Sequence, residues 1–154
     1  DFAIQKAVDL EASAISPVIT EHCVVRLKAA QAEERLERWK KIALNAGKQS
    51  GCAWLPKITP VTDLDRYLAE RPAFDLLLVG ALTGKTRPFK AVLRSLPARP
   101  KTIGVFIGPE GDFSERELQA ILSSGAIPVT FGDNVLRVET AAIYALSVLR
   151  YEFG

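Results

Sequence analysis

Residues 107–117 read Ile-Gly-Pro-Glu-Gly-Asp-Phe-Ser-Glu-Arg-Glu, and this stretch decides the fold of the chain. The apolar run 103–107 stops at Gly108, and the Pro-Glu-Gly that follows is typical of a tight turn. Ser114 and Glu117 have the spacing of a capping box, which predicts that a helix begins there. A strand that breaks at glycine and passes into a helix leaves backbone N–H groups free at its carboxyl end, where α/β proteins bind ligands.

Two further strand ends have the same character. The apolar run 127–131 ends at Gly132 and is followed by Asn134-Val-Leu-Arg-Val-Glu-Thr-Ala141, which opens the last helix. Upstream, Val79-Gly-Ala-Leu82 follows another apolar run. Loops of this kind offer backbone N–H and C=O groups beside apolar side chains. Together they predict one pocket for a flat ligand with polar edges, such as adenine.

From residue 74 onward, apolar strands alternate with amphipathic helices. The strands are expected at 75–79, 102–107 and 127–131, and the helices at 88–95, 115–124 and 139–151. Continuous apolar strands separated by helices are the signature of a parallel sheet that is covered on both faces. The sequence therefore predicts an α/β protein.

The first half of the chain is less regular. Helices are expected at 2–10, 32–47 and 62–70, the last with Thr62 as N-cap and Asp65 at the capping-box position. Extended segments are expected at 14–20, interrupted by Pro17, at 24–27, and at 54–58, where Pro56 favours a sheet edge.

Composition narrows the function classes. At 154 residues, 48% hydrophobic and 25% charged, the chain is an ordinary globular one and most simply a single domain. Its two cysteines and one histidine have no metal-ligand spacing, so we expect no metal and no histidine-based triad. No apolar run has transmembrane length and no signal peptide is evident, so we expect no membrane association and a cytoplasmic location.

A cluster of cations lies within residues 26–57. The formal charge of +2 does not by itself indicate a nucleic-acid partner, and glutamates at 33, 34 and 37 alternate with the cations, so a solvated helix face explains them equally well. The cluster consists of Arg26, Lys28, Arg35, Arg38, Lys40, Lys41, Lys48 and Lys57. The dinucleotide fingerprint, the Walker A sequence and the hydrolase nucleophile elbow are all absent from the sequence.

The paired motifs resemble those of the RsmE family, which are bacterial methyltransferases acting on N3 of a uridine in small-subunit (16S) ribosomal RNA. The motifs are Gly108-Pro-Glu-Gly111 with Phe113-Ser114 and Glu117, then Gly132, then Leu136-Arg137-x-Glu139-Thr140-Ala141. Upstream, Gln5-Lys6-Ala7, Pro17, Thr20-Glu21, Trp39 and Gln49-Ser50 agree with the same family. The resemblance covers essentially the whole chain.

This resemblance implies a SPOUT fold, in which the C-terminal segment of an α/β domain threads through a loop as a deep trefoil knot. It implies S-adenosylmethionine bound in the knot, a homodimer with the RNA site shared between subunits, and small-subunit ribosomal RNA as partner. The family usually carries an N-terminal PUA-like RNA-binding domain, so residues 1–154 are expected to be the single SPOUT methyltransferase domain.

The resemblance also assigns roles. Arg137 and Glu110 are the expected catalytic residues, because a guanidinium near O2 or O4 would stabilise the anion that forms as uracil N3 loses its proton. Expected RNA contacts are Lys6, Arg26 and Gln49. The expected cofactor contacts are Leu78, Val79, Gly80, Ile107, Gly108, Gly111, Phe131, Gly132, Val135, Leu136 and Thr140.

Structural alternatives remain open for several of these residues. Glu110 could satisfy N–H groups of its own turn, Arg137 could pair with Glu139 or Glu110, and Thr140 could be the N-cap of the last helix. Lys6 and Gln49 could be solvated helix residues.

The chain departs from the family pattern in the half expected to meet RNA. The departures are Asp9-Leu10-Glu11, His22-Cys23 and the segment 45–52. As a result, two basic residues that the family pattern places near the RNA are absent from this chain. A non-catalytic RNA- or ribosome-binding module of the same fold, or a methyltransferase with a different RNA target, is therefore the competing hypothesis.

Overall fold

A four-stranded parallel sheet forms the centre of the molecule, in a computed structural model that describes residues 1–23, 28–82 and 84–154. The strand order is β6-β8-β5-β7, with β5 spanning Leu76–Gly80, β6 Arg87–Pro88, β7 Ile103–Ile107 and β8 Ile127–Thr130. The strands expected at 75–79, 102–107 and 127–131 are confirmed to within a residue. The short β6 was not predicted, because two residues carry no periodicity.

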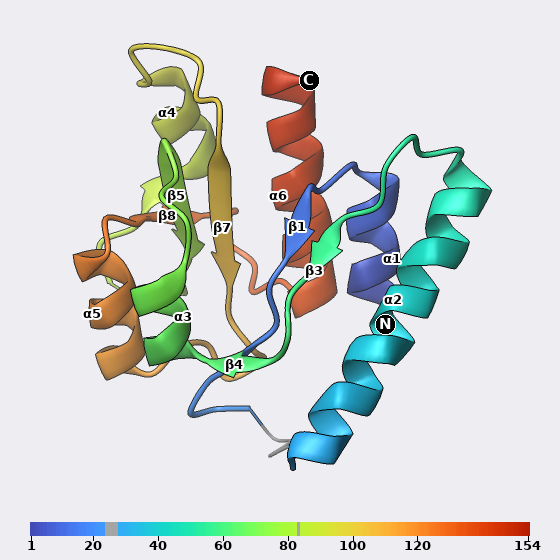
Figure 1. Ribbon diagram of the computed structural model, residues 1–154. Coiled ribbons are helices and arrows are strands. Elements are labelled where there is room, and N and C mark those ends of the chain that lie inside the picture. Colours follow the sequence, from blue (N-terminus) through green and yellow to red (C-terminus); the bar gives the residue numbers. More distant parts are fainter. Residues whose placement is uncertain (24–27, 83) are drawn as a thin grey trace.

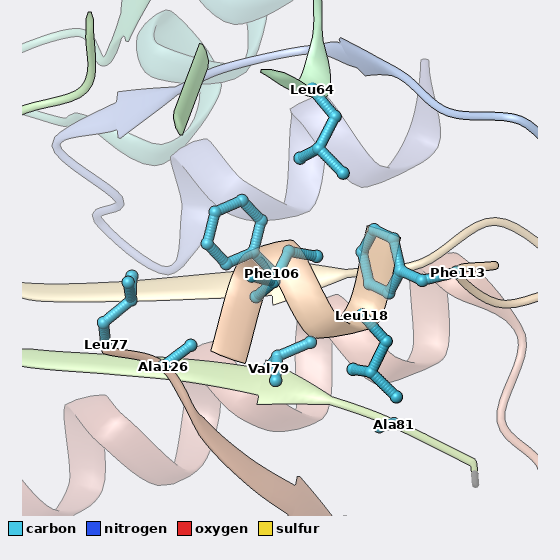
Figure 2. Close-up of a cluster of buried hydrophobic side chains, with 9 residues drawn as sticks. Leu64, Leu77, Val79, Ala81, Phe106, Phe113, Leu118 and Ala126 are labelled. Atoms are coloured by element: carbon cyan, nitrogen blue, oxygen red, sulfur yellow. The ribbon is translucent and has the colours of Figure 1, made fainter. Parts of the chain in front are cut away.

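Side chains of β5 alternate between the two faces of the sheet. Leu77 and Val79 pack on one face against α3 (Leu64–Glu70) and α5 (Glu115–Ser123), in the cluster shown in Figure 2. Leu76 and Leu78 pack on the opposite face against α4 (Phe89–Arg94) and α6 (Val138–Phe153). Each such fully buried side chain contributes about 1.5–3 kcal/mol of burial free energy. The prediction of a parallel sheet covered on both faces is confirmed.

The N-terminal third packs beside α6 (Figure 1). Helix α1 (Phe2–Asp9) lies between α2 (Ala29–Ser50) and α6, and its Ile4 and Val8 are buried against α2. Two short parallel strand pairs connect this part to the centre: β1 (Ala14–Ile15) with β3 (Lys57–Ile58), and β2 (Val18–Ile19) with β4 (Thr62–Asp63). Pro17 separates β1 from β2, as the sequence predicted.

Some predicted boundaries were wrong. Helix α3 is capped by Asp63, whose carboxylate accepts the Arg66 N–H at 2.8 Å, while Thr62 belongs to strand β4. The expected strand 54–58 is reduced to Lys57–Ile58, and α2 extends three residues beyond each predicted end, stopping at Gly51, whose φ of 67° is left-handed. The extended segment expected at 24–27 lies outside the described residues.

Candidate functional site

The carboxyl ends of β5, β7 and β8 meet at one edge of the sheet, as parallel strands require. The loops that follow these strands line a trough that encloses about 60 Å³, or about 490 Å³ when its open mouth is counted. Six of the residues expected to contact the cofactor line this trough: Gly80, Ile107, Gly108, Phe131, Gly132 and Leu136. The remaining lining residues are Ala81, Leu82, Pro109, Asp112, Val129, Thr130, Asn134, Val138 and Ala141.

Two glycines explain how the trough keeps its shape. Gly80 faces the Phe131 ring so closely that a Cβ on it would lie 2.7 Å from Phe131 Cε2. Gly132 has a φ of 135°, which side chains rarely allow, and a Cβ there would meet nothing within 4 Å. The trough therefore combines an aromatic wall with exposed backbone, and its residues fit a nucleoside with a flat base.

A second, wider hollow of about 400 Å³ adjoins the trough. The two share Ile107, Gly108, Pro109 and Val138 as a common wall. The other residues of the second hollow are Asp1, Phe2, Ala3, Val18, Thr20, Cys23, Glu110 and Glu139. The turn 108–110 thus stands between two hollows, which is the arrangement that two reacting molecules need.

Helix α5 begins directly after this turn, with the predicted capping box. The Ser114 hydroxyl accepts the Glu117 N–H at 3.3 Å, and the Glu117 carboxylate accepts the Ser114 N–H at 3.0 Å. Glu117 is almost fully buried, and its other oxygen accepts the N–H of Glu21 at 2.8 Å. The capping box therefore also holds the segment 20–23 against the turn.

Neighbouring charges strengthen this anchoring. Arg116 donates to the Glu21 carboxylate at 2.8 Å and to Asp65 at 3.1 Å. The hydrogen bond from Arg116 lowers the pKa of Glu21, and the hydrogen bonds to Glu21 and Asp65 raise the pKa of Arg116. All three side chains are exposed, so each ion pair is worth little alone and the network acts mainly by orienting the segment.

His22 contacts the same turn. Its Nδ1 lies 2.9 Å from the carbonyl oxygens of both Gly111 and Asp112. Because both partners are acceptors, Nδ1 must carry a proton. These two hydrogen bonds, Asp112 first, raise the pKa of His22 above its ordinary 6.5, with smaller contributions from the charges of Glu117 and Glu21.

Five predicted cofactor residues do not line the trough. Leu78 and Val79 are fully buried in the two core clusters, because residues inside a strand point into the faces of the sheet. Gly111 faces His22, and Val135 is 71% exposed. Thr140 is exposed within the first turn of α6, whose N-cap is Arg137, so the structural alternative of Thr140 as the N-cap was wrong.

The two expected catalytic residues are placed differently. Glu110 lines the second hollow, as does Glu139 of α6. Arg137 is exposed at the N-cap of α6, where its carbonyl accepts the Ala141 N–H at 2.8 Å. Among the described residues its guanidinium forms no ion pair with Glu110 or Glu139.

Of the expected RNA contacts, Lys6 and Gln49 do not line either hollow. Lys6 pairs with Asp9 at 2.8 Å on α1, and Gln49 is exposed near the end of α2. Arg26 lies outside the described residues. The cations of α2 are largely exposed, and Arg38 and Lys40 pair with Asp1 and Glu37.

The described residues offer neither a metal-binding cluster nor a membrane-spanning helix. No group of three or more histidine, cysteine, aspartate or glutamate side chains there is arranged to hold a metal ion. No helix in these ranges is both long and apolar enough to cross a bilayer.

Sequence comparisons agree with the predicted resemblance. The family model described as "RNA methyltransferase domain" matches residues 1–150. The ribosomal RNA small subunit methyltransferase E of Bacillus subtilis is 33% identical over 99% of this chain and 60% of its own length. The protein of the same name from Mesomycoplasma hyopneumoniae is 31% identical over 96% of this chain and 62% of its own length. The chain thus spans about three fifths of these relatives.

Solved structures show the same fold. A putative methyltransferase of Legionella pneumophila in complex with S-adenosylmethionine superposes with a TM-score of 0.87 at 33% identity, over 97% of this chain and 60% of that one. A ribosomal RNA small subunit methyltransferase E of Neisseria gonorrhoeae bound to the same cofactor gives 0.86 at 31% identity, over 99% and 60%.

Proposed function

The chain belongs to the RNA methyltransferase domain family, and we propose that it is an S-adenosylmethionine-dependent methyltransferase acting on N3 of a uridine in small-subunit ribosomal RNA. The single observation that carries the proposal is the trough at the ends of β5, β7 and β8 beside a second, acid-lined hollow. Relatives spanning this chain are named as methyltransferases of that RNA, and solved neighbours hold that cofactor.

The trough is the proposed cofactor site. Ile107, Phe131 and Leu136 provide apolar contacts to the adenine, and Gly132 lets the ligand approach the backbone. Bound S-adenosylmethionine supplies the methyl group that is transferred. The SPOUT trefoil knot belongs to this proposal, supported by the position of β8 between β5 and β6 and by the joining of three loops around one trough.

The second hollow is the proposed place of the target base. Uracil N3 carries a proton at neutral pH and becomes nucleophilic as that proton leaves. Glu110 lines this hollow together with Glu139, and we assign its carboxylate the role of accepting the proton. Arg137 directly precedes α6, and we assign its guanidinium to the negative charge that develops on the uracil oxygens. The residues of the chain thus position the base and stabilise charge.

Assembly and RNA contact complete the proposal. Helix α6 leaves Tyr144 and Tyr151 exposed, and we assign them to a two-fold interface between identical chains. We assign contact with RNA to the exposed cations of α2, together with Lys6, Gln49 and Arg26. The described domain is the proposed catalytic unit.

One observation favours a second candidate function. His22, Asn45 and Cys52, which depart from the family pattern, lie in the N-terminal half, where RNA contact is expected. A module that binds ribosomal RNA without methyl transfer would tolerate such changes.

Mapping modified nucleotides by mass spectrometry separates the two functions. Small-subunit ribosomal RNA is compared between cells with and without the gene. Loss of one N3-methyluridine on deletion, restored by the wild-type gene, supports the enzyme. An unchanged modification pattern supports the binding module.

A further inference from the structure

We propose that Asp112 and His22 are positioning residues that tie three distant segments together and so fix the geometry of the trough. The inference rests on the proposed function in one respect, since it takes the trough to be the cofactor site. Neither residue was expected to have a role from the sequence.

Asp112 connects two walls of the trough. Its Oδ2 accepts the backbone N–H of Leu82 at 2.9 Å, and its Oδ1 accepts the N–H of Phe113 at 2.8 Å. Leu82 follows β5 and Asp112 follows β7, and both residues line the trough. One carboxylate therefore spans the gap between the two loops.

The hydrogen bonds at this position suit a carboxylate side chain. Two N–H donors point at the two oxygens, and only a carboxylate offers an acceptor to each. An asparagine could accept one N–H but would present its own NH₂ group to the other. The backbone φ of 58° is left-handed, a conformation that aspartate, asparagine and glycine tolerate better than other residues.

His22 holds the turn from the other side. A single Nδ1–H shared between the carbonyls of Gly111 and Asp112 binds two consecutive peptide groups. The ring also packs on Gly111, where a Cβ would lie 3.1 Å from the His22 Cβ. The backbone N–H of Glu21, the residue before it, donates to the buried carboxylate of Glu117. The segment that carries His22 is therefore fixed in place.

The connections form one continuous path. They run from segment 20–23, through the imidazole, to the Asp112 backbone, and from the Asp112 carboxylate to Leu82. If this path breaks, the loop after β5 and the turn after β7 can separate, and the ligand has to order them when it binds. The cost is expected in cofactor affinity more than in overall stability, because the core clusters are untouched.

The first test compares Asp112→Asn and Asp112→Gly with the control Asp133→Asn. Asparagine retains the left-handed backbone and one hydrogen bond, while glycine retains the backbone and loses both. Asp133 is an exposed carboxylate in the next loop and has no hydrogen-bond partner among the described residues. S-adenosylhomocysteine is titrated by calorimetry. We expect the affinity to fall about tenfold or more for Asp112→Gly, less for Asp112→Asn, and not for Asp133→Asn.

A second readout needs no ligand. The Leu82 amide proton, bonded to a carboxylate, is expected at low field in NMR spectra and protected from exchange. Asp112→Gly, which removes the carboxylate altogether, should shift it upfield and expose it. Retention of its shift and protection in Asp112→Gly overturns the inference, whatever the affinity.

His22→Asn and His22→Leu test the other half of the path. Asparagine Nδ2 lies near the position of histidine Nδ1 and can donate to the same carbonyls, whereas leucine cannot. We expect His22→Leu to weaken S-adenosylhomocysteine binding several-fold and His22→Asn to restore most of the loss. Equal binding by the wild type and His22→Leu, or equal losses in both variants, contradicts the inference. Failure of the wild type to bind instead contradicts the proposed function, and the Leu82 amide then decides this inference alone.

Discussion

The carboxylate of Glu117 accepts the backbone N–H of Glu21 at 2.8 Å, across 96 residues of sequence. The same carboxylate closes the capping box of α5 through the N–H of Ser114. One buried side chain thus begins a helix and also secures the N-terminal segment that lies on the turn 108–112.

Glu117→Gln should destabilise the fold. The amide can accept only one of the two N–H groups, and the other is left facing an NH₂ donor in a buried site. Leaving a buried donor unsatisfied costs about 1–3 kcal/mol. Thermal or urea unfolding should show this loss, while Glu115→Gln, an exposed glutamate in the same helical turn, should change stability by less than about 0.5 kcal/mol. Equal unfolding of the two variants would show that the buried carboxylate is not needed.

The contact made by His22 should depend on pH. Hydrogen bonds to the Asp112 and Gly111 carbonyls raise its pKa above 6.5, so folding favours the protonated ring. The stabilisation is fully present below the unfolded pKa of about 6.5 and declines as pH rises through the folded pKa. Glu21 and Glu117 face the ring and contribute in the same direction.

Unfolding of the wild type and His22→Leu between pH 5.5 and 9 measures this dependence. The difference in unfolding free energy should be largest at the acid end and smaller above neutrality, where only the neutral Nδ1–H remains. A difference that grows with pH would have the wrong sign for this contact.

Arg137→Lys separates chemistry from binding. Lysine retains the charge but loses the planar pair of donors, so methyl transfer should fall by about a hundredfold, or on the order of 3 kcal/mol. Affinity for S-adenosylhomocysteine should change far less, because Arg137 does not line the trough. The assay uses RNA that contains the target uridine. Equal losses of activity and affinity would make Arg137 a structural residue of the α6 N-terminus.

Helix α6 should form a dimer interface. Its Ala145 and Leu149 are buried against the sheet and so are not available to a partner chain. Tyr144 and Tyr151 remain 41% and 89% exposed, and their spacing of seven residues puts them on one face of the helix. Light scattering at micromolar concentration should give twice the chain mass, and Tyr151→Glu should lower it. If the wild type instead has the mass of a single chain, an RNA site shared between two subunits is contradicted.

The regular half of the fold was predictable because each strand there is a continuous apolar run that ends at glycine. The loops of the trough followed from the same pattern. The individual lining residues could not be predicted from this pattern. Leu78 and Val79 precede the end of β5 and point into the core, whereas Leu82 and Asp112, which line the trough, lie in the loops after β5 and β7. The role of Asp112 depends on a residue 30 positions away, which no local periodicity reveals. Predicted and observed boundaries differ by three residues at the start of the strand around Pro56, where a short strand carries little periodicity, and by three at each end of α2, where periodicity does not mark the helix ends.

Two neighbouring residues test the lining of the trough. Leu136 lines it and Val135 is exposed outside it, although both were expected to contact the cofactor. Leu136→Ala should weaken S-adenosylhomocysteine binding by about tenfold, because it removes apolar contact worth about 1–2 kcal/mol. Val135→Ala should bind as the wild type does. If Val135→Ala instead binds more weakly than Leu136→Ala, the adenine lies on the other side of this loop.

Titration of the wild-type protein with S-adenosylhomocysteine tests the central claim most directly. Calorimetry in the presence of a metal chelator should show one saturable site per chain, with the Leu136→Ala variant weaker than the wild type. No heat at high ligand concentration, or binding that Leu136→Ala leaves unchanged, would contradict a cofactor site at the ends of β5, β7 and β8.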